Sequence, residues 1–199
     1  MGDMDGRVVA LVGRGDEVHR ALAVACAEAG ASIALGTVEP TQDQEFAVNS
    51  IANELWAIGR EHFVRVMDAA EPTSGPVFAD ECWDTLRRCD ALVVMTACES
   101  SAPIEELSSD EWEAVLRAGA TAAFLQLQAF GRLMVREGGG LMLAAFPRRD
   151  GADAAERAAL AALRESVEVM DAAWRPKGVR CRLVEQATFD DVLAGLPTP

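Results

Sequence analysis

Short apolar runs alternate with amphipathic helical stretches along almost the whole chain, and this alternation constrains the fold most strongly. The run Ala91–Thr96 is apolar up to its last residue, as expected for a parallel strand that helices cover on both faces. Ser32–Gly36 and Leu141–Phe146 are similar runs, each followed by a stretch with helical periodicity. The pattern predicts one domain over residues 1–199, an α/β fold with a doubly wound parallel sheet of about six strands.

The expected elements follow from these runs and from the residues that end them. Strands are expected at Arg7–Gly13, Ser32–Gly36, Phe63–Met67, Ala91–Thr96, Leu141–Phe146 and Val179–Val184. Helices are expected at Asp16–Ala29, Gln42–Ile58, Val77–Arg88, Ser108–Glu137, Ala152–Trp174 and, as a short piece, Phe189–Leu193. The pair Ser108 and Glu111 is a capping box at the start of the longest helix.

Acidic residues outnumber basic ones, 32 to 18, and the net charge is −14. This excess argues against a nucleic-acid partner and against an anionic membrane surface, because both need clustered positive charge. No apolar run approaches the roughly 18 residues of a membrane span. The five cysteines show no paired spacing, which favours reduced, buried thiols in a cytoplasmic protein.

Two rare residue types limit the chemistry. The chain has no Tyr, and Lys177 is its only Lys. His19 and His62 are the only histidines and lie far apart in the sequence. We therefore expect no metal site and no mechanism that depends on a tyrosine phenol.

Several segments resemble the short-chain dehydrogenase/reductase family, in the family's order and over nearly the whole chain. RVVALVG…RALAVACAEAGASIAL, from Arg7, resembles its first strand, helix and second strand. CDALVVMTA, from Cys89, resembles the strand before its Asn-Asn-Ala-Gly turn, and PIEELSSDEWEAVLRAGATAAFLQLQAF, from Pro103, resembles the long helix that follows. RPKGVRCRLV, from Arg175, resembles the sixth strand. The resemblance implies a Rossmann-like fold, truncated at the C-terminus relative to the family.

The family's phosphate loop, T-G-x-x-x-G-x-G, is matched at its first glycine by Gly13. Glu17 falls on the second glycine and His19 on the third. Those glycines let the backbone approach a pyrophosphate and let the helix pack closely on the strand. Asp16 and Glu17 are either an internal substitute for the anion at this helix start or simply first-turn acids.

The family's catalytic Asn and Ser are also replaced. The Asn within the long helix matches Gly119, and the Ser after the fifth strand matches Ala145 or Phe146. The Asn-Asn-Ala-Gly turn matches Val94–Ala97. Together with the absence of Tyr, these replacements argue against a working family active site.

The family's Tyr-x-x-x-Lys pair has two possible matches. Alignment on AALAAL places it on Asp153 and Arg157, whereas counting back from the sixth strand places it on Glu156 and Leu160. Neither alignment supplies a Tyr or a Lys, and Lys177 stands in the turn before the sixth strand. In the family this pair moves the hydroxyl proton during hydride transfer, so no catalytic residue is expected here.

Three residues stand at cofactor-contacting positions as vestiges: Gly13, Glu39 and Asp68. Glu39 follows the second strand, where a Rossmann acid binds a ribose hydroxyl, and Asp68 resembles the family Asp that contacts adenine. A solvated loop acid and a helix cap are the alternatives for these two. Since the loop glycines are missing, no cofactor is expected, and NAD or NADP is expected only if the chain is an active oxidoreductase.

These replacements predict a noncatalytic family member that assembles with, or regulates, an active short-chain dehydrogenase/reductase. The first alternative is an atypical NAD(P)-dependent oxidoreductase that uses Ser100 or Asp153. The second is a redox-inert module that binds a nucleotide or acyl ligand in the crevice. The segments 98–101 and 148–150 follow strands at the edge of the sheet where ligands bind in this architecture, so they are further candidates.

The family resemblance implies a partner, either a second copy or an active homologue. Members pair through the helices that correspond here to residues 108–137 and 152–174. Small side chains that permit close helix packing recur on both: Ala118, Ala122, Ala129, Ala158, Ala159, Ala161 and Ala162. A bulky residue in place of Ala122 or Ala159 is expected to break the assembly.

The sixth strand alternates apolar residues with Arg180 and Arg182. A strand covered on both faces would not alternate in this way. We therefore expect Val179–Val184 to be an edge of the sheet, with both Arg side chains at least partly exposed.

Overall fold

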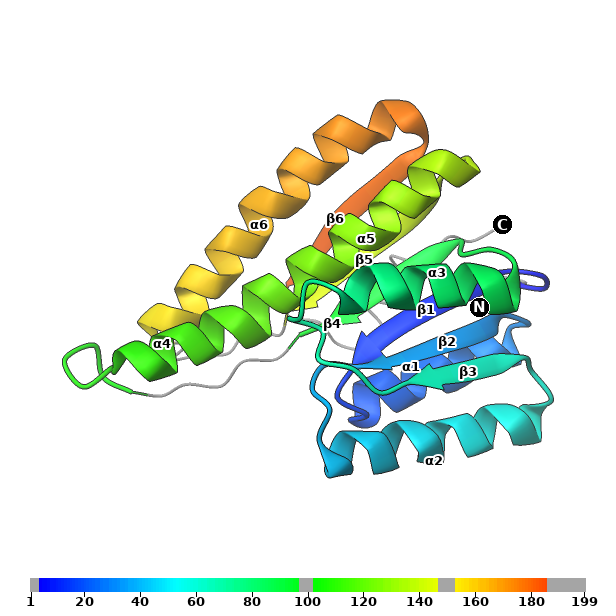
Figure 1. The fold of residues 1–199 in the computed structure, drawn as a ribbon, viewed down its shortest axis with the longest axis horizontal. Helices are drawn as coiled ribbons and strands as arrows, with labels where there is room; N and C mark the ends of the chain where they lie inside the picture. Colours follow the sequence, from blue (N-terminus) through cyan, green and yellow to red (C-terminus); the bar gives the residue numbers. More distant parts are fainter. Residues whose placement is uncertain (1–3, 97–101, 147–152, 186–199) are drawn as a thin grey trace.

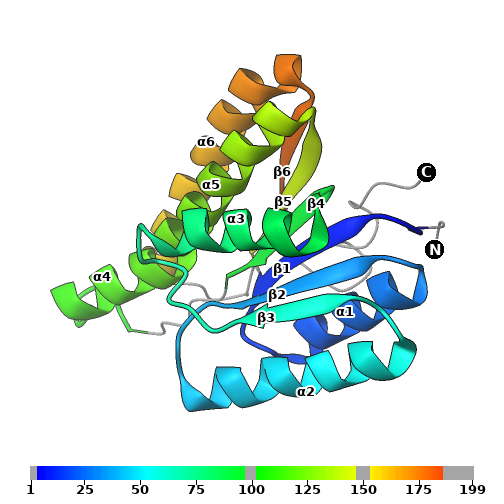
Figure 2. The same cartoon turned by 45° about the vertical axis from the view of Figure 1, so that its right-hand side comes forward.

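The computed structural model describes residues 4–96, 102–146 and 153–185. In these residues six parallel strands form one sheet in the order β3-β2-β1-β4-β5-β6, with helices on both faces (Figures 1 and 2). The predicted α/β fold with a doubly wound parallel sheet is confirmed. The order reverses between β1 and β4, which is where ligands bind in such sheets.

The strands and helices alternate as the apolar pattern predicts. The strands are β1 Val8–Gly13, β2 Ser32–Thr37, β3 His62–Arg65, β4 Ala91–Met95, β5 Gly140–Phe146 and β6 Val179–Glu185. The α-helices are α1 Glu17–Glu28, α2 Gln42–Ile58, α3 Ser74–Leu86, α4 Ser109–Leu116, α5 Ala122–Glu137 and α6 Ala154–Trp174. A π-helix, Arg117–Thr121, joins α4 to α5, and a 3₁₀ turn, Arg175–Lys177, follows α6.

Two apolar layers hold the helices on the sheet. Alternate residues of β1 point to opposite faces, so Val9 and Leu11 pack beneath α1 and α2, whereas Ala10 and Val12 pack beneath α3, α5 and α6. All four side chains are fully buried. Because β1 is buried on both faces, its sequence has no polar residue.

Local signals at the ends of elements explain why the observed bounds of α2 agree with the predicted ones and why β3 ends earlier than predicted. Thr41 caps α2 by accepting the N–H of Gln44, and Gly59 ends it in the left-handed conformation, as both residue types favour. The strand β3 stops at Arg65, two residues before the expected end. There the N–H of Met67 turns to the hydroxyl of Thr37 instead of continuing the ladder.

The helix expected over 108–137 is interrupted, and α3 begins three residues earlier than expected. The predicted capping box is present, since Ser108 and Glu111 exchange both hydrogen bonds. The π-helix after α4 adds a residue to one turn, which sequence periodicity does not reveal.

The helix α3 starts before its expected first residue because Pro76 lies within its first turn, where a missing N–H costs no helical bond. The short helix expected at Phe189–Leu193 lies outside the described residues.

The predicted edge position of β6 is confirmed for the part of the chain that the structure describes. There β6 pairs with β5, and the side chains of Arg180 and Arg182 are exposed. On this strand the N–H of Cys181 donates to the Asp171 carboxylate of α6, 2.9 Å away. The edge is thus protected by charge and, at one N–H, by a side chain.

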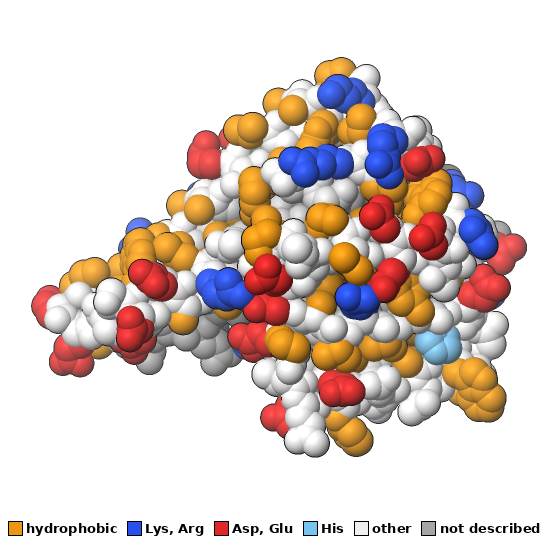
Figure 3. Space-filling view, in the orientation of Figure 1, with side chains coloured by type: hydrophobic (Ala, Val, Ile, Leu, Met, Phe, Trp, Pro, Cys, Tyr) orange, Lys and Arg blue, Asp and Glu red, His pale blue; other side chains and the backbone are white. Residues whose placement is uncertain are grey.

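The helix α4 and the first turns of α6 pack together and extend beyond the sheet as an arm, whereas the rest of α6 packs along β6 (Figures 1 and 2). Acidic side chains gather at the free end of this arm, where α4 begins (Figure 3). Of the seven alanines expected at an interface, three are buried, two are partly buried and two are exposed. Ala122 and Ala159 are fully buried within the chain, so their expected role at an interface is wrong, whereas Ala161 and Ala162 are exposed.

In the described parts of the chain, no helix combines the length and the apolar character needed to cross a bilayer.

Candidate functional site

The turn between β1 and α1 lies at the carboxyl edge of the sheet, beside the point where the strand order reverses. Asp16 caps α1, and its carboxylate accepts the N–H of His19 at 2.9 Å. The Glu17 side chain is 81% exposed and lies 3.4 Å from Arg20. Glu17 therefore points to solvent, and its carboxylate does not occupy the helix N-terminus as an internal anion.

His19 fills the space beneath this turn. Its side chain is completely buried, and Nδ1 accepts a hydrogen bond from the N–H of Gly15 at 3.1 Å. Burial lowers the pKa of His19 to about 4, because charging an imidazole away from water is costly. A Cβ at position 13 would lie 2.7 Å from His19 Nδ1, so Gly13 makes room for the ring.

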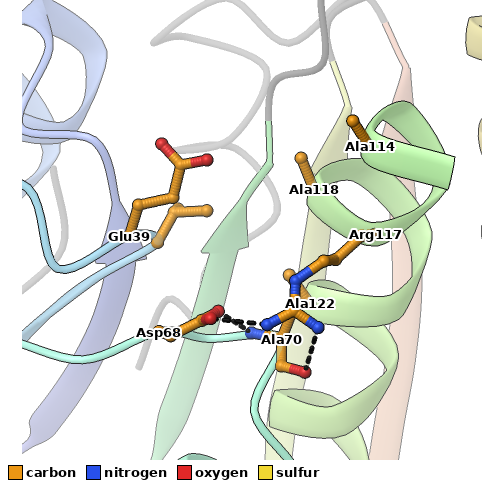
Figure 4. A pocket seen from close by; sticks show the side chains of 8 residues that line it. Glu39, Asp68, Ala70, Ala114, Arg117, Ala118 and Ala122 are labelled. Atoms are coloured by element: carbon orange, nitrogen blue, oxygen red, sulfur yellow. Dashed lines mark hydrogen bonds and ion pairs between the residues drawn. The ribbon is translucent and has the colours of Figure 1, made fainter. Parts of the chain in front are cut away.

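A pocket of about 130 Å³ opens between the ends of β2 and β3 and the helices α4 and α5 (Figure 4). Its lining residues are Val38, Glu39, Asp68, Ala70, Ala114, Arg117, Ala118 and Ala122. Three of them, Ala114, Ala118 and Ala122, stand at i, i+4 and i+8, so they face the same side. They form a smooth wall opposite the strand ends.

An ion pair crosses the pocket from strand side to helix side. Arg117 Nη2 donates to Asp68 Oδ2 at 2.5 Å, and Nη1 donates to the carbonyl of Ala70 at 3.3 Å. The other oxygen of Asp68 accepts the N–H of Ala70 at 2.9 Å. Figure 4 shows the guanidinium lying between these two partners. Asp68 thus closes its own turn and anchors the helix side. The helix cap expected as an alternative is not formed, because α3 begins only at Ser74, after Thr73.

Glu39 is held at the mouth of the same pocket. Its carboxylate accepts from Nε2 of Gln44 at 3.2 Å and lies 3.6 Å from Nη2 of Arg14. Gln44 is buried, and its Oε1 accepts the N–H groups of both Val38 and Glu39. The corner after β2 is therefore rigid, and Glu39 is positioned by specific contacts rather than solvated freely.

These groups fit the adenosine half of a dinucleotide. The alanine wall offers a flat apolar surface to a planar base, Asp68 offers a carboxylate to its edge, and Glu39 offers one to ribose hydroxyls. The N–H groups of Glu17 and Val18 belong to the first turn of α1, where the helix supplies no acceptors. They lie where a pyrophosphate binds in such folds.

The positions that match the family's catalytic residues hold different side chains. Gly119 is buried in the π-helix, which packs against α6, and Ala145 is buried at the end of β5. Asp153 caps α6, and Arg157 is exposed one turn later. In the other alignment Glu156 is buried in the first turn of α6. A carboxylate is therefore the group with acid–base capability at either Tyr position.

Sequence reasoning found some of these residues and missed others. It singled out Glu39 and Asp68, which the structure brings to one pocket, and Gly13, which lies against His19. It missed Arg117, Arg14 and Gln44, although the Ala114-Ala118-Ala122 spacing could have indicated a common helix face. The candidate segments 98–101 and 148–150 lie outside the described residues. Within the described ranges, no three His, Cys, Asp or Glu side chains gather around a possible metal position.

Comparison with known proteins connects this geometry to a family. The family model described as "Enoyl-(Acyl carrier protein) reductase" matches residues 18–195. The chain belongs to the short-chain dehydrogenase/reductase family. This short-chain dehydrogenase/reductase is 27% identical over 194 residues to D-threitol dehydrogenase of Mycolicibacterium smegmatis, and the match covers 91% of this chain and 69% of that protein.

Two solved structures share the fold of this short-chain dehydrogenase/reductase. Carveol dehydrogenase from Mycobacterium avium, in complex with NAD, superposes with a TM-score of 0.85 at 16% identity, over 93% of this chain and 72% of that one. A short chain dehydrogenase from Mycobacterium paratuberculosis, bound to NAD, superposes with a TM-score of 0.85 at 17% identity, over 92% and 73%.

The expectation that no cofactor belongs to this crevice is wrong. Proteins of the same fold hold NAD, and a relative in sequence is a dehydrogenase. That expectation rested on the missing loop glycines and on the acids Asp16 and Glu17 at the start of α1. In the structure the Glu17 side chain points away from the loop, and the pocket between Glu39, Asp68 and the alanine wall is open.

Proposed function

We propose that this short-chain dehydrogenase/reductase binds NAD in its crevice and acts as a noncatalytic subunit, in an assembly with a second copy or with an active homologue. The observation that carries this proposal is the set of residues at the family's catalytic positions. Gly119 and Ala145 have no polar side chain, and no Tyr occurs anywhere in the sequence. Lys177 lies beyond the far end of α6, about 30 Å along the helix from its first turn.

The proposed cofactor site uses the residues described above. Glu39 would accept from ribose hydroxyls, Asp68 from the base, and the first N–H groups of α1 would hold the pyrophosphate. A bound nicotinamide supplies hydride transfer in this family. Without a phenol and lysine beside it, the chain has no family-type group to move the hydroxyl proton.

The outer face of α6 is the proposed contact surface. Ala162, Val169 and Ala173 are exposed and lie at spacings of seven and four residues, so they lie along one side of the helix as a stripe that Glu165 and Ser166 interrupt. Val169 is 67% exposed, which is unusual for a valine on a helix that also has a buried face. Small residues on such a stripe permit close approach of a second helix across a two-fold axis.

Two measurements test the proposal. We expect NAD to quench the tryptophan fluorescence of the purified chain, and we expect no oxidation of D-threitol or of simple secondary alcohols with NAD. Loss of a general acid/base typically costs about 10²–10⁴-fold in rate. NAD-dependent oxidation by the chain alone, at a rate less than about 10²-fold below that of an active family member, would refute the noncatalytic role. An absence of NAD binding would refute the cofactor site.

Sedimentation equilibrium tests the contact surface. The wild-type chain is expected to have a mass that is a multiple of 21.2 kDa, and Ala162→Glu should reduce it to the single-chain value. Ala57→Glu, at an exposed alanine of α2, is the matched control and should leave the mass unchanged. A wild-type mass of one chain would exclude self-assembly, and co-purification from the native host would then test pairing with a homologue.

The buried carboxylate of Glu156 favours a second candidate function, an atypical NAD-dependent oxidoreductase. At this position Glu156 would accept the hydroxyl proton of an alcohol, and NAD held by the residues named above would supply the hydride acceptor. If turnover is found, Glu156→Gln should abolish it. Glu165→Gln, on an exposed part of the same helix, should not.

A further inference from the structure

The arm, formed by α4 and the first turns of α6, meets the nucleotide pocket at Arg117. Within α4 Val115 is the one buried residue, so this helix is weakly anchored by apolar packing. The Arg117 side chain, by contrast, reaches across the pocket to Asp68 and to the carbonyl of Ala70. These contacts tie the end of α4 to the turn after β3.

Arg117 is also the residue at which the helix changes its winding. It begins the π-helix, and its carbonyl accepts the N–H of Ala122, five residues later. A π-turn holds one residue more than an α-turn and is often found at functional sites. Its conversion to an α-turn would rotate α4 relative to α5, so the winding at this joint sets the orientation of α4.

We propose that Arg117 is a positioning residue that couples occupancy of the pocket to the orientation of α4, so that nucleotide binding releases the end of α4 from the turn after β3. The proposal rests on the proposed function in one respect, namely that the ligand is NAD. It adds a means by which binding of the nucleotide changes the conformation of a noncatalytic subunit.

The coupling follows from competition for one carboxylate. Asp68 already accepts from Ala70 and Arg117, and the side chains of Asp68 and Arg117 are partly exposed, 34% and 52% respectively. A base amino group that donates to Asp68 competes with the guanidinium for the same oxygen. By thermodynamic linkage, a ligand that weakens the ion pair binds more tightly when the pair is already absent.

Hydrogen exchange of backbone amides in residues 109–121, with and without NAD, tests the coupling. In the wild-type chain we expect NAD to speed exchange in this segment by about two- to fivefold, the range expected for loss of an exposed ion pair. In Arg117→Met the exchange should already be fast without NAD, and NAD should add nothing. NAD should bind this variant about two- to fivefold more tightly than wild type.

Arg132→Met is the matched control, because Arg132 is exposed on α5 and lines no part of the pocket. It should respond to NAD as wild type does. The coupling is overturned if NAD binds without changing exchange at 109–121, if it slows exchange there, or if Arg117→Met keeps the wild-type response. Failure of NAD to bind either wild type or Arg117→Met would overturn the proposed cofactor site and the coupling together.

Discussion

The imidazole of His19 accepts a hydrogen bond from the N–H of Gly15, with 3.1 Å between the two nitrogens. The acceptor must be an unprotonated Nδ1, so the contact exists when the ring is neutral. Gly15 adopts a positive φ of 79°, which glycine accepts at little cost. The pair therefore defines the shape of the turn at which the family binds phosphate.

The first prediction concerns the pH dependence of stability. The pKa of His19 is lowered to about 4 in the folded chain by burial, from 6.5, so the unfolded chain takes up the proton first as the pH falls. The stability that neutral His19 contributes is fully present above about pH 6.5 and is lost progressively towards pH 4. The total loss is about 3 kcal/mol.

Urea unfolding of wild type and His19→Gln between pH 7 and pH 4.5 measures this effect. The glutamine does not titrate, so the difference in unfolding free energy between the two proteins should narrow on acidification. His62→Gln, at the chain's other histidine, controls for the loss of one imidazole. A constant difference between wild type and His19→Gln would contradict the prediction.

The second prediction concerns packing between α5 and the end of α6. A Cβ at Gly131 would lie 2.2 Å from the ring of Trp174, so Gly131→Ala should destabilise the fold by about 1–3 kcal/mol through overpacking. The double variant Gly131→Ala with Trp174→Leu should recover part of that loss. Thermal unfolding of the single and double variants checks this, and additive effects would argue against direct contact.

The third prediction concerns the start of α4. The Ser108 hydroxyl accepts the N–H of Glu111 at 3.2 Å, and hydrogen bonds from Ser108 lower the pKa of the Glu111 carboxyl. Ser108→Ala should therefore cost about 1 kcal/mol, as loss of an N-cap usually does. Ser109→Ala, one position into the helix, should cost far less. Equal effects in denaturant unfolding would show that the cap contributes little.

The fourth prediction concerns thiol reactivity. Burial raises the pKa of Cys26 and of Cys181 to about 12, so almost no thiolate is present at pH 8. We expect both to resist labelling by a disulfide reagent in the folded chain and to react rapidly in urea. Mass spectrometry of labelled peptides distinguishes these two sites, and fast labelling of either in the native protein would contradict their burial.

Local signals determined most of the element order. The helix α2 has the predicted bounds, because Thr41 and Gly59 act on residues within one turn of themselves. The strands β1, β2, β4 and β5 are recognisable because their apolar runs are covered on two faces, and β6 because it alternates with arginine at an exposed edge. The other edge strand, β3, is only partly buried, and its predicted end is two residues too late. Glu39 and Asp68, the acids that line the pocket, could also be identified from the sequence as candidate cofactor-contacting residues, because each follows a predicted strand.

The tertiary structure decided which residues far apart in the chain contact one another. Arg117 and Asp68 are separated by 49 positions in the sequence. They form an ion pair because the fold places the end of α4 across the pocket from the turn after β3. The same holds for the alanines, since the packing of α5 and α6 on the sheet buries Ala122 and Ala159 but leaves Ala162 exposed. Periodicity shows that a helix has an apolar face, but the neighbours of that face are set by the order of the strands.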